Sequence, residues 1–307
     1  MKTKIEWATD VWNPITGCTK VSAGCKNCYA ERFAHRLAGR FGYPEDDPFR
    51  VTLHMDHLRD PLHWRKHRRV FVCSMGDLFH PDVPRAWIDE VFMIMDMSPR
   101  HTFMILTKRP DRMCEYVTDL LMSRTMRMSA PLQILPNVWM NVSVENQEAA
   151  DERIPWLLNT PAKVRGVSCE PLLGPVDLSW SLLYNGMHHG NVYYQKLDWV
   201  IVGGESGSGA RPMHPDWARS LRDQCQGAGV PFFFKQFGRW IYDDNPTNPT
   251  WPDGTPVSPD DHPVVLRDVG KKAAGRLLDG REWNEYPGWE LESPEHANCL
   301  CHMVNVK

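Results

Sequence analysis

The sequence TFMILTKRPDRMCEYVTDLLM, residues 102–122, contains the unit from which the chain is built. It begins with a continuous apolar run, Thr102 to Thr107, passes through Lys108 and Arg109, and continues with helical periodicity. Continuous apolar runs are typical of parallel strands that are buried on both faces. The stretch therefore predicts a strand, a polar strand end and a helix that packs back on the sheet.

The same order recurs along the chain. We expect eight strands, at residues 11–15, 51–55, 70–75, 102–107, 138–144, 164–169, 199–203 and 231–235. We expect helices at residues 28–40, 85–97, 111–122, 146–158 and 215–228. Strands that alternate with helices favour a parallel sheet. Eight of them predict an α/β fold, a (β/α) barrel of TIM type, full or partial, with an open flavodoxin-like sheet as the alternative.

The pattern changes after Gly238. Residues 243–263 are rich in proline, aspartate and asparagine and have no helical or strand periodicity, which is typical of a long loop or lid. A last helix is expected within residues 270–283. We therefore divide the chain into a barrel domain, residues 1–240, with an N-terminal cysteine loop, and an irregular C-terminal extension or lid, residues 241–307. Cys299 and Cys301 in the tail are candidates for a second metal site or for a reduced tail.

Composition excludes several classes of protein. The chain has 307 residues, 42% of them apolar, and a net charge of −3, which does not favour general binding of polyanions. No apolar run reaches the ~18 residues of a membrane span, and no signal-peptide stretch opens the sequence. Nine cysteines without the spacing of a small secreted scaffold do not fit a disulfide framework. We expect a cytoplasmic protein that does not bind membranes.

Three cysteines lie within the loop Gly17 to Ala30, with the spacing C-x6-C-x2-C. Cysteines at this density usually hold a metal or an iron–sulfur cluster. Because the next cysteine is Cys73, the loop offers three thiolates and an open position, as a 4Fe-4S cluster that binds a ligand at its fourth iron requires. The alternative is a zinc site completed by a histidine such as His35 or by a distant cysteine.

Most of the expected strands end in polar residues. In (β/α) barrels the active site forms at the carboxyl ends of the strands. The residues that follow these ends, or lie near them, are Ser74, Asp77, Thr107, Lys108, Arg109, Asn141, Ser143, Glu145, Ser168, Glu170, Glu205, Ser206, Lys235 and Gln236. Together they predict a polar cavity at the mouth of the barrel.

The cysteine loop resembles the cluster-binding loop of radical S-adenosylmethionine (SAM) enzymes, in which three cysteines hold three irons and SAM chelates the fourth. The commonest spacing there is C-x3-C-x2-C, with an aromatic residue before the last cysteine. Here the first gap is six residues, Asn27 precedes Cys28, and Tyr29 follows it. Radical SAM enzymes also often carry a Gly-Gly-Glu stretch that receives the SAM amino group, usually after the second strand. Gly203-Gly204-Glu205 follows the seventh expected strand, and a simple tight turn is the alternative.

The chain as a whole resembles a phage- and prophage-associated three-cysteine-motif family without an established reaction. The resemblance runs from near the start of the chain to Gly238. It rests on the cysteine loop and on Trp12-Asn13-Pro14, Asp77-Leu78-Phe79-His80, Leu106-Thr107-Lys108-Arg109-Pro110, Glu170-Pro171-Leu172 and Gly203-Gly204-Glu205-Ser206-Gly207.

These resemblances imply an enzyme in which Cys18, Cys25 and Cys28 hold a 4Fe-4S cluster that cleaves SAM to a 5′-deoxyadenosyl radical. We take Glu170 and Glu205 as candidate catalytic residues. The candidate cofactor-binding residues are Tyr29, Asn141, Gly203, Gly204, Glu205 and Arg211. The expected partners are SAM, an electron donor that reduces the cluster, and a phage-encoded protein.

The sequence does not identify the substrate. Phage association and the basic stretches 65–69 and 108–112 point to a nucleotide or nucleic acid, although the first stretch also fits a solvated connector. Two other classes of function stay open: a zinc-dependent hydrolase or nuclease on a barrel, and a non-enzymatic phage accessory protein with a structural metal site.

Overall fold

A computed structural model of the chain describes residues 2–128, 135–184, 186–193, 195–243 and 265–288. Cys299, Cys301 and most of the expected lid lie outside the described residues. None of the described helices is both long enough and apolar enough to cross a bilayer.

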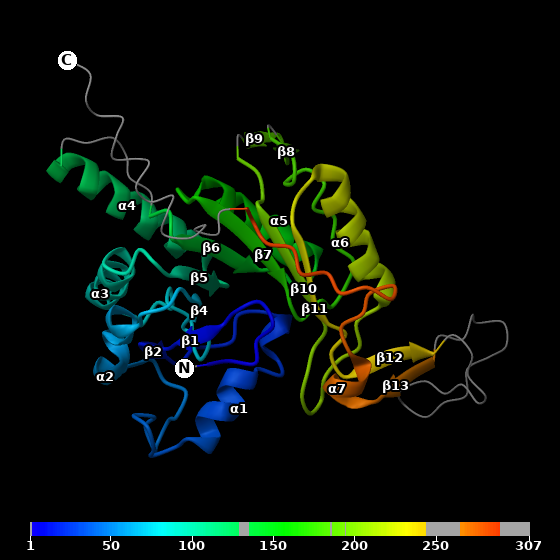
Figure 1. Cartoon of the computed structure of the whole chain (residues 1–307), viewed down its shortest axis with the longest axis horizontal. Helices are drawn as coiled ribbons and strands as arrows, with labels where there is room; N and C mark the ends of the chain where they lie inside the picture. Colours follow the sequence, from blue (N-terminus) through cyan, green and yellow to red (C-terminus); the bar gives the residue numbers. More distant parts are fainter. Residues whose placement is uncertain (1, 129–134, 185, 194, 244–264, 289–307) are drawn as a thin grey trace.

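A seven-stranded parallel sheet forms the centre of the fold and curls into a half-barrel (Figure 1). Its strands follow one another in chain order: β1 (Asp10–Trp12), β4 (Arg69–Val72), β5 (Thr102–Thr107), β6 (Val138–Ser143), β7 (Val164–Cys169), β10 (Trp199–Gly203) and β11 (Phe232–Gln236). β1 and β11 are the two edges, so the described strands do not close into a barrel. The expectation of a partial (β/α) barrel fits this sheet, and full closure of TIM type is not seen.

One expected strand of the barrel is wrong. Residues 51–55 contribute only β3 (Thr52–Leu53), which pairs antiparallel with β2 (Ile15–Thr16) outside the main sheet. The reason is that β1 and β4 already pair with each other, with Asp10 opposite Val70, and leave no place between them. Gly203 to Glu205 therefore follows the sixth strand of the sheet rather than the seventh of a barrel.

The outer face of the sheet is covered by four helices: α3 (Arg85–Asp96), α4 (Pro110–Met128), α5 (Gln147–Asn159) and α6 (Pro215–Ala228) (Figure 1). Their apolar stripes join the outward side chains of the strands in the main core. In α3 the stripe consists of Ile88, Val91, Phe92 and Met95, all buried, as the helical periodicity predicts. The remaining helices are α1 (Tyr29–Arg36), α2 (Met55–Leu58) and α7 (Gly270–Ala274), the last much shorter than expected from residues 270–283.

The inner face of the sheet changes from aromatic to polar along the strands. At the amino-terminal end, Trp139, Trp199 and Phe233 point inward and are covered by Trp7, with the rings of Trp139 and Trp199 5.6 Å apart. Further along the central strands the same inward rows carry polar or small side chains, Asn141 and Ser143 in β6 and Gly166 and Ser168 in β7. This alternation follows from the two-residue period of a strand. The half-barrel thus has a closed aromatic floor and a polar mouth.

Two hairpins stand outside the sheet. β8 (Gly186–His188) and β9 (Asn191–Tyr193) form one hairpin within the connection from β7 to β10. β12 (Trp240–Asp243) and β13 (Val265–Asp268) form the other, after β11.

The chain then returns to the half-barrel. The amide of Phe234 donates to the carbonyl of Trp283 over 3.0 Å, and the amide of Glu285 donates to the carbonyl of Phe232 over 3.2 Å. Leu278 is fully buried in the main core. Residues 278–286 therefore extend the packing at the β11 edge, whereas the expected division at residue 240 stays a prediction.

The buried position of Leu278 gives a testable consequence. We expect Leu278→Ala to lower the free energy of unfolding by about 2–5 kcal/mol, because it leaves a cavity in the core next to β11. The neighbouring Leu277 is 56% exposed, so Leu277→Ala is the matched control and is expected to change stability by less than about 1 kcal/mol. Chemical denaturation of the full chain measures both. Equal effects of the two substitutions would show that this segment does not belong to the core.

Candidate functional site

The cysteine loop lies across the polar mouth of the half-barrel, between β2 and α1. Its first residues are anchored by the backbone: the amide of Gly17 donates to Met75 and the amide of Cys18 donates to Phe49. Gly17 has a φ of +93°, and a Cβ at this position would collide with the carbonyl group of Arg50. A side chain is therefore excluded here, and the glycine lets the chain turn into the loop.

Arg109 holds the beginning of the loop. It follows β5, and its guanidinium donates to Asp77 Oδ2 over 2.9 Å, to Cys18 Sγ over 3.3 Å and to both oxygens of Thr19 over 3.1 Å. Asp77 and Arg109 are both buried. Asp77 also accepts from the Thr107 hydroxyl over 2.7 Å and from the Lys108 amide. The carboxylate thus positions the guanidinium, and the guanidinium positions Cys18.

His80 supports Thr19 from the other side. His80 is buried, its Nδ1 accepts from the Asp82 amide over 3.1 Å, and its Nε2 lies 2.8 Å from the Thr19 hydroxyl. Burial and the charge of Arg109 lower the pKa of His80. A neutral ring with its proton on Nε2 satisfies both contacts.

The middle of the loop is held by the residue that follows β6. The amide of Gly24 donates to Glu145 Oε1 over 3.4 Å, and Arg153 donates to Glu145 Oε2 over 2.8 Å. Burial opposes the charge of Glu145, but Lys108 and Arg153 outweigh burial and lower its pKa. Glu145 is therefore a buried carboxylate that binds the loop.

The end of the loop is held by the residues that follow β10. Asn27 donates to Glu205 Oε2 over 3.0 Å and to the carbonyl of Gly209 over 2.7 Å. Arg211 forms a bidentate pair with Glu205, with contacts of 2.7 and 2.8 Å. Glu205 and Arg211, both expected to contact a ligand, are thus paired with each other, and Glu205 fixes the residue next to Cys28.

The three cysteines share this loop and are half-buried without any disulfide. Burial and the Asp77 carboxylate raise the pKa of Cys18 to about 11 against the effect of Arg109. Burial also acts to raise the pKa of Cys25, but hydrogen bonds from the backbone of Val21 and Ser22 and the charge of Lys108 lower it overall. Cys25 is therefore the thiol of this pair that ionises more readily.

The spacing of the three sulfurs bears on what they can hold. A single zinc ion with Zn–S bonds of about 2.3 Å places its sulfur ligands roughly 3.8 Å apart. Among the described residues, the set of three metal-ligating side chains whose donor atoms all lie within 4.8 Å of one another is Asp151, His188 and His189. The three cysteine sulfurs do not form such a set, so at least two of them lie more than 4.8 Å apart in this structure, wider than the spacing around a single zinc ion.

Below the loop, the inward rows of β6 and β7 carry two buried acceptors without partners. Asn141 donates to the carbonyl of Ile105 over 2.9 Å, but neither its Oδ1 nor the hydroxyl of Ser168 makes a hydrogen bond among the described residues. Buried polar atoms are rarely left unsatisfied, so this surface is suited to a ligand or to ordered water. Gly166 lies directly against Asn141 and leaves room for its amide.

Glu170 lies at the mouth next to this surface. Lys235 on β11 contacts both of its carboxylate oxygens over 2.7 Å, and Gln236 donates to it over 3.4 Å. Gly203 packs closely on the same carboxyl group. Tyr29 is 44% exposed, yet its hydroxyl donates to the carbonyl of Ser74, and burial of that hydroxyl raises its pKa.

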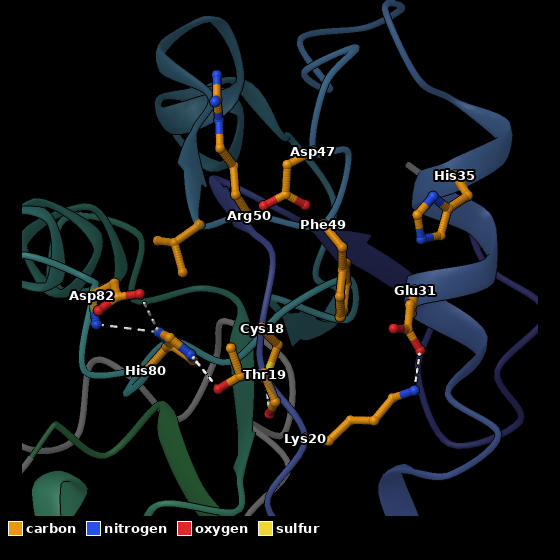
Figure 2. A pocket seen from close by; sticks show the side chains of 11 residues that line it. Cys18, Thr19, Lys20, Glu31, His35, Asp47, Phe49, Arg50, His80 and Asp82 are labelled. Atoms are coloured by element: carbon orange, nitrogen blue, oxygen red, sulfur yellow. Dashed lines mark hydrogen bonds and ion pairs between the residues drawn. The ribbon is translucent and has the colours of Figure 1, made fainter.

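A cavity of about 460 Å³ opens beside Cys18 on the side of α1 (Figure 2). Charged side chains line much of it: Lys20, which pairs with Glu31 over 2.9 Å, together with Asp47, Arg50 and Asp82. His35 lies on this cavity as well, beyond Glu31 on α1 (Figure 2). The cavity offers a polar route to the loop from outside the half-barrel.

The structure thus brings the three cysteines, Asn27, Glu145 and Glu205 together at the mouth. It places Glu170, Asn141 and Tyr29 around the inner surface. Sequence reasoning named Asp77, Glu145 and Arg109 only as polar strand ends and missed their part in holding the loop. The signal was present, because Asp77, His80 and Arg109 all lie in the stretches that carry the family resemblance.

The two pKa shifts predict different reactivity for two neighbouring cysteines. In the metal-free full chain, we expect iodoacetamide to alkylate Cys25 faster than Cys18 at neutral pH, because the thiolate is the nucleophile. The rate at Cys25 should level off below pH 9, while the rate at Cys18 should keep rising to about pH 11. Peptide mass spectrometry measures both rates, with buried Cys73 as the unreactive control. Identical pH profiles would contradict the assigned environments.

The buried pair of Asp77 and Arg109 predicts a large loss of stability. Arg109→Ala leaves the carboxylate buried without its partner and should cost about 3–5 kcal/mol. The matched control is Arg85→Ala, which breaks an exposed pair with Asp119 of the same 2.9 Å length and should cost about 0–1 kcal/mol. Chemical denaturation compares them, and a small effect at Arg109 would show that the pair does not hold the loop.

Comparison with known proteins assigns the chain to a family without a known activity. No curated protein and no solved structure matches it significantly. A family described as "Protein of unknown function (DUF5131)" matches residues 2–287, nearly the whole length. The chain is therefore a member of the DUF5131 family.

Proposed function

We propose that this protein is a radical SAM-type enzyme that holds a 4Fe-4S cluster on Cys18, Cys25 and Cys28 and modifies a substrate in the half-barrel. The observation that carries the proposal is the placement of the loop. Three unbridged cysteines lie at the carboxyl edge of a parallel half-barrel, and their loop is tied to residues following β5, β6 and β10. This edge is where (β/α) folds place their active sites.

When bound, a reduced cluster of this kind supplies the electron that cleaves SAM. The chain's own contribution is to position and shield the loop. Arg109 holds the Cys18 sulfur over 3.3 Å and brings a positive charge next to it, which partly offsets the burial that disfavours the thiolate a metal requires. Asn27, held by Glu205 and Gly209, fixes the backbone before Cys28.

The inner surface is the proposed binding site for SAM and substrate. Asn141 Oδ1 and the Ser168 hydroxyl are free to accept hydrogen bonds from a ligand. Glu170 and Lys235 offer one negative and one positive charge side by side at the mouth. Gly203 and Gly204 present backbone without side chains, and Tyr29, at the end of the loop, donates its hydroxyl to the carbonyl of Ser74 after β4. The paired Glu205 and Arg211 act in this proposal by holding the loop.

A nucleotide or nucleic acid as substrate is part of the proposal. In the basic stretches Arg65 and Lys66 are exposed, whereas three arginines make contacts within the protein. Arg68 pairs with Asp10 over 2.6 Å and stacks on Trp64. Arg109 and Arg112 make contacts within the protein, Arg112 with the carbonyls of His80 and Val83. These side chains are therefore used within the fold and are not presented as a phosphate-binding surface.

The decisive experiment is anaerobic purification, assay of iron and sulfide, and a search for 5′-deoxyadenosine after reduction with dithionite in the presence of SAM. We expect about four irons and four sulfides per chain, as a 4Fe-4S cluster requires, and 5′-deoxyadenosine that depends on dithionite. Cys25→Ala should abolish the product. Cys225→Ala, which removes a buried thiol on α6, is the matched control and should retain it.

Three results would count against the proposal. Zinc at the cysteines without iron or sulfide would favour the zinc-dependent hydrolase or nuclease. An intact cluster that neither binds nor cleaves SAM would favour an accessory protein with a structural metal site. A cluster whose loading is unchanged in Cys25→Ala would remove the cysteine loop from its assigned role.

A further inference from the structure

The helix α5 and the β8–β9 hairpin together carry a second group of metal-ligating side chains, far along the chain from the cysteine loop. Asp151 on α5 and the adjacent His188 and His189 of the β8–β9 hairpin each offer one ligand atom, and these atoms all lie within 4.8 Å of one another. We propose that they form a binding site for a divalent transition metal of the zinc class, which joins the hairpin to α5.

The chemistry of the three donors fits such an ion. Imidazole and carboxylate groups together are common ligands of zinc, at about 2.0–2.2 Å from the metal. Donor atoms around one ion then lie roughly 3–4 Å apart. His188 Nε2 and Asp151 Oδ1 already lie 3.4 Å apart. Three protein ligands leave one position for water, as in sites that are open to a further ligand.

The contact between His188 and Asp151 is not explained as an ordinary hydrogen bond. His188 Nε2 is buried, but it makes no hydrogen bond among the described residues in spite of the nearby carboxylate. A nitrogen lone pair directed at a shared ion would satisfy this atom. In the contact with Asp151 alone, His188 Nε2 and the carboxylate are too poorly aligned for a hydrogen bond.

Neighbouring side chains orient two of the three ligands. The ring of His188 stacks on Trp180, with centroids 4.0 Å apart and an angle of 7° between the planes. Gln147 donates to Asp151 Oδ1 over 2.8 Å, and its own carbonyl oxygen accepts from the amide of Asp177 over 2.7 Å. Hydrogen bonds of this kind to ligand carboxylates are a regular feature of metal sites.

The turn of the hairpin gives an independent indication. His188 pairs with Asn191, so His189 and Gly190 form a two-residue turn, and both have positive φ, +46° and +79°. Such turns strongly favour Asn-Gly. Histidine therefore occupies a position where asparagine would suit the backbone better, and it brings its ring within 4.1 Å of the His188 ring. Histidine is tolerated at positive φ, and at this position its imidazole is available as a ligand.

The turn also supplies the test variant. His189→Asn removes the ligand and creates the preferred Asn-Gly turn, so the hairpin is expected to fold at least as well as before. His63→Asn, which replaces an exposed histidine on the short helix Asp60–His63, is the matched control. Zinc is the probe, and both changes are made in the full-length Cys25→Ala chain so that the cysteine loop does not dominate binding.

We expect Cys25→Ala to bind zinc at this site in competition with a chromophoric chelator, and its melting temperature to rise with zinc. Adding His189→Asn should weaken the affinity by at least about tenfold and remove the zinc-dependent rise. Adding His63→Asn should change neither. Asp151→Asn should act like His189→Asn.

Zinc affinity that is unchanged by His189→Asn overturns the proposal. An equal loss of zinc affinity in the His63→Asn control overturns it as well, and so does a Cys25→Ala chain that binds no zinc. The proposed radical SAM activity is read separately, as iron, sulfide and 5′-deoxyadenosine in the chain with intact cysteines. Either proposal can therefore fail while the other stands.

Discussion

The structure depends on a single constraint: each strand of the sheet is buried on both faces and must supply two different rows of side chains. The outward rows pack against α3 to α6 and are mostly apolar. The inward rows are aromatic at the amino-terminal end and polar at the carboxyl end, as in β6, where Trp139 is followed by Asn141 and Ser143. Because the floor is filled by tryptophan and phenylalanine rings, ligand space can form only at the opposite end of the half-barrel.

The cysteine loop depends in turn on buried charges at that polar end. Asp77 and Arg109 lose their hydration on folding, a cost that is recovered only if their hydrogen bonds are well aligned. The guanidinium satisfies this by contacting Asp77, Cys18 and Thr19 together. Glu145 with Arg153 and Glu205 with Arg211 repeat the arrangement for the middle and the end of the loop. The positions of the cysteines are thus set by strand ends that are distant in the sequence.

Much of this organisation could be predicted from the sequence, because it follows from short-range patterns. Apolar runs located all seven strands of the sheet, and the period-3.6 apolar pattern located α6 with the bounds Pro215–Ala228. The prediction of a sheet strand at residues 51–55 was wrong, because an apolar run does not determine which strand it pairs with. The position beside β1 is occupied by β4. The helix expected at residues 270–283 ends early, at Gly275, which has a φ of +71°.

The site was harder to predict than the fold. The cysteine spacing and the polar strand ends are local signals, and in the structure the cysteine loop contacts residues that follow β5, β6 and β10. Which charges pair across the mouth is not local: Glu205 and Arg211 look like ligand contacts in the sequence, and only the folded chain shows that they bind each other. The site at Asp151, His188 and His189 was missed for the same reason. Its members come from a helix and from a hairpin turn 37 residues later, and no sequence motif connects them.

The paired charges also limit what the mouth can bind. Lys235 and Glu170 neutralise each other at 2.7 Å, so a ligand with a single charge would separate them and leave one of them without a partner. In a partly buried site that loss is costly. A ligand that carries both an ammonium and a carboxylate, as an amino acid does, can exchange partners with the pair and leave every charge compensated. The same surface supplies neutral acceptors at Asn141 and Ser168 for the remaining polar atoms of such a ligand. The electrostatics of the mouth therefore disfavour a simple anion near Glu170, whereas a group of zero net charge leaves both charges compensated.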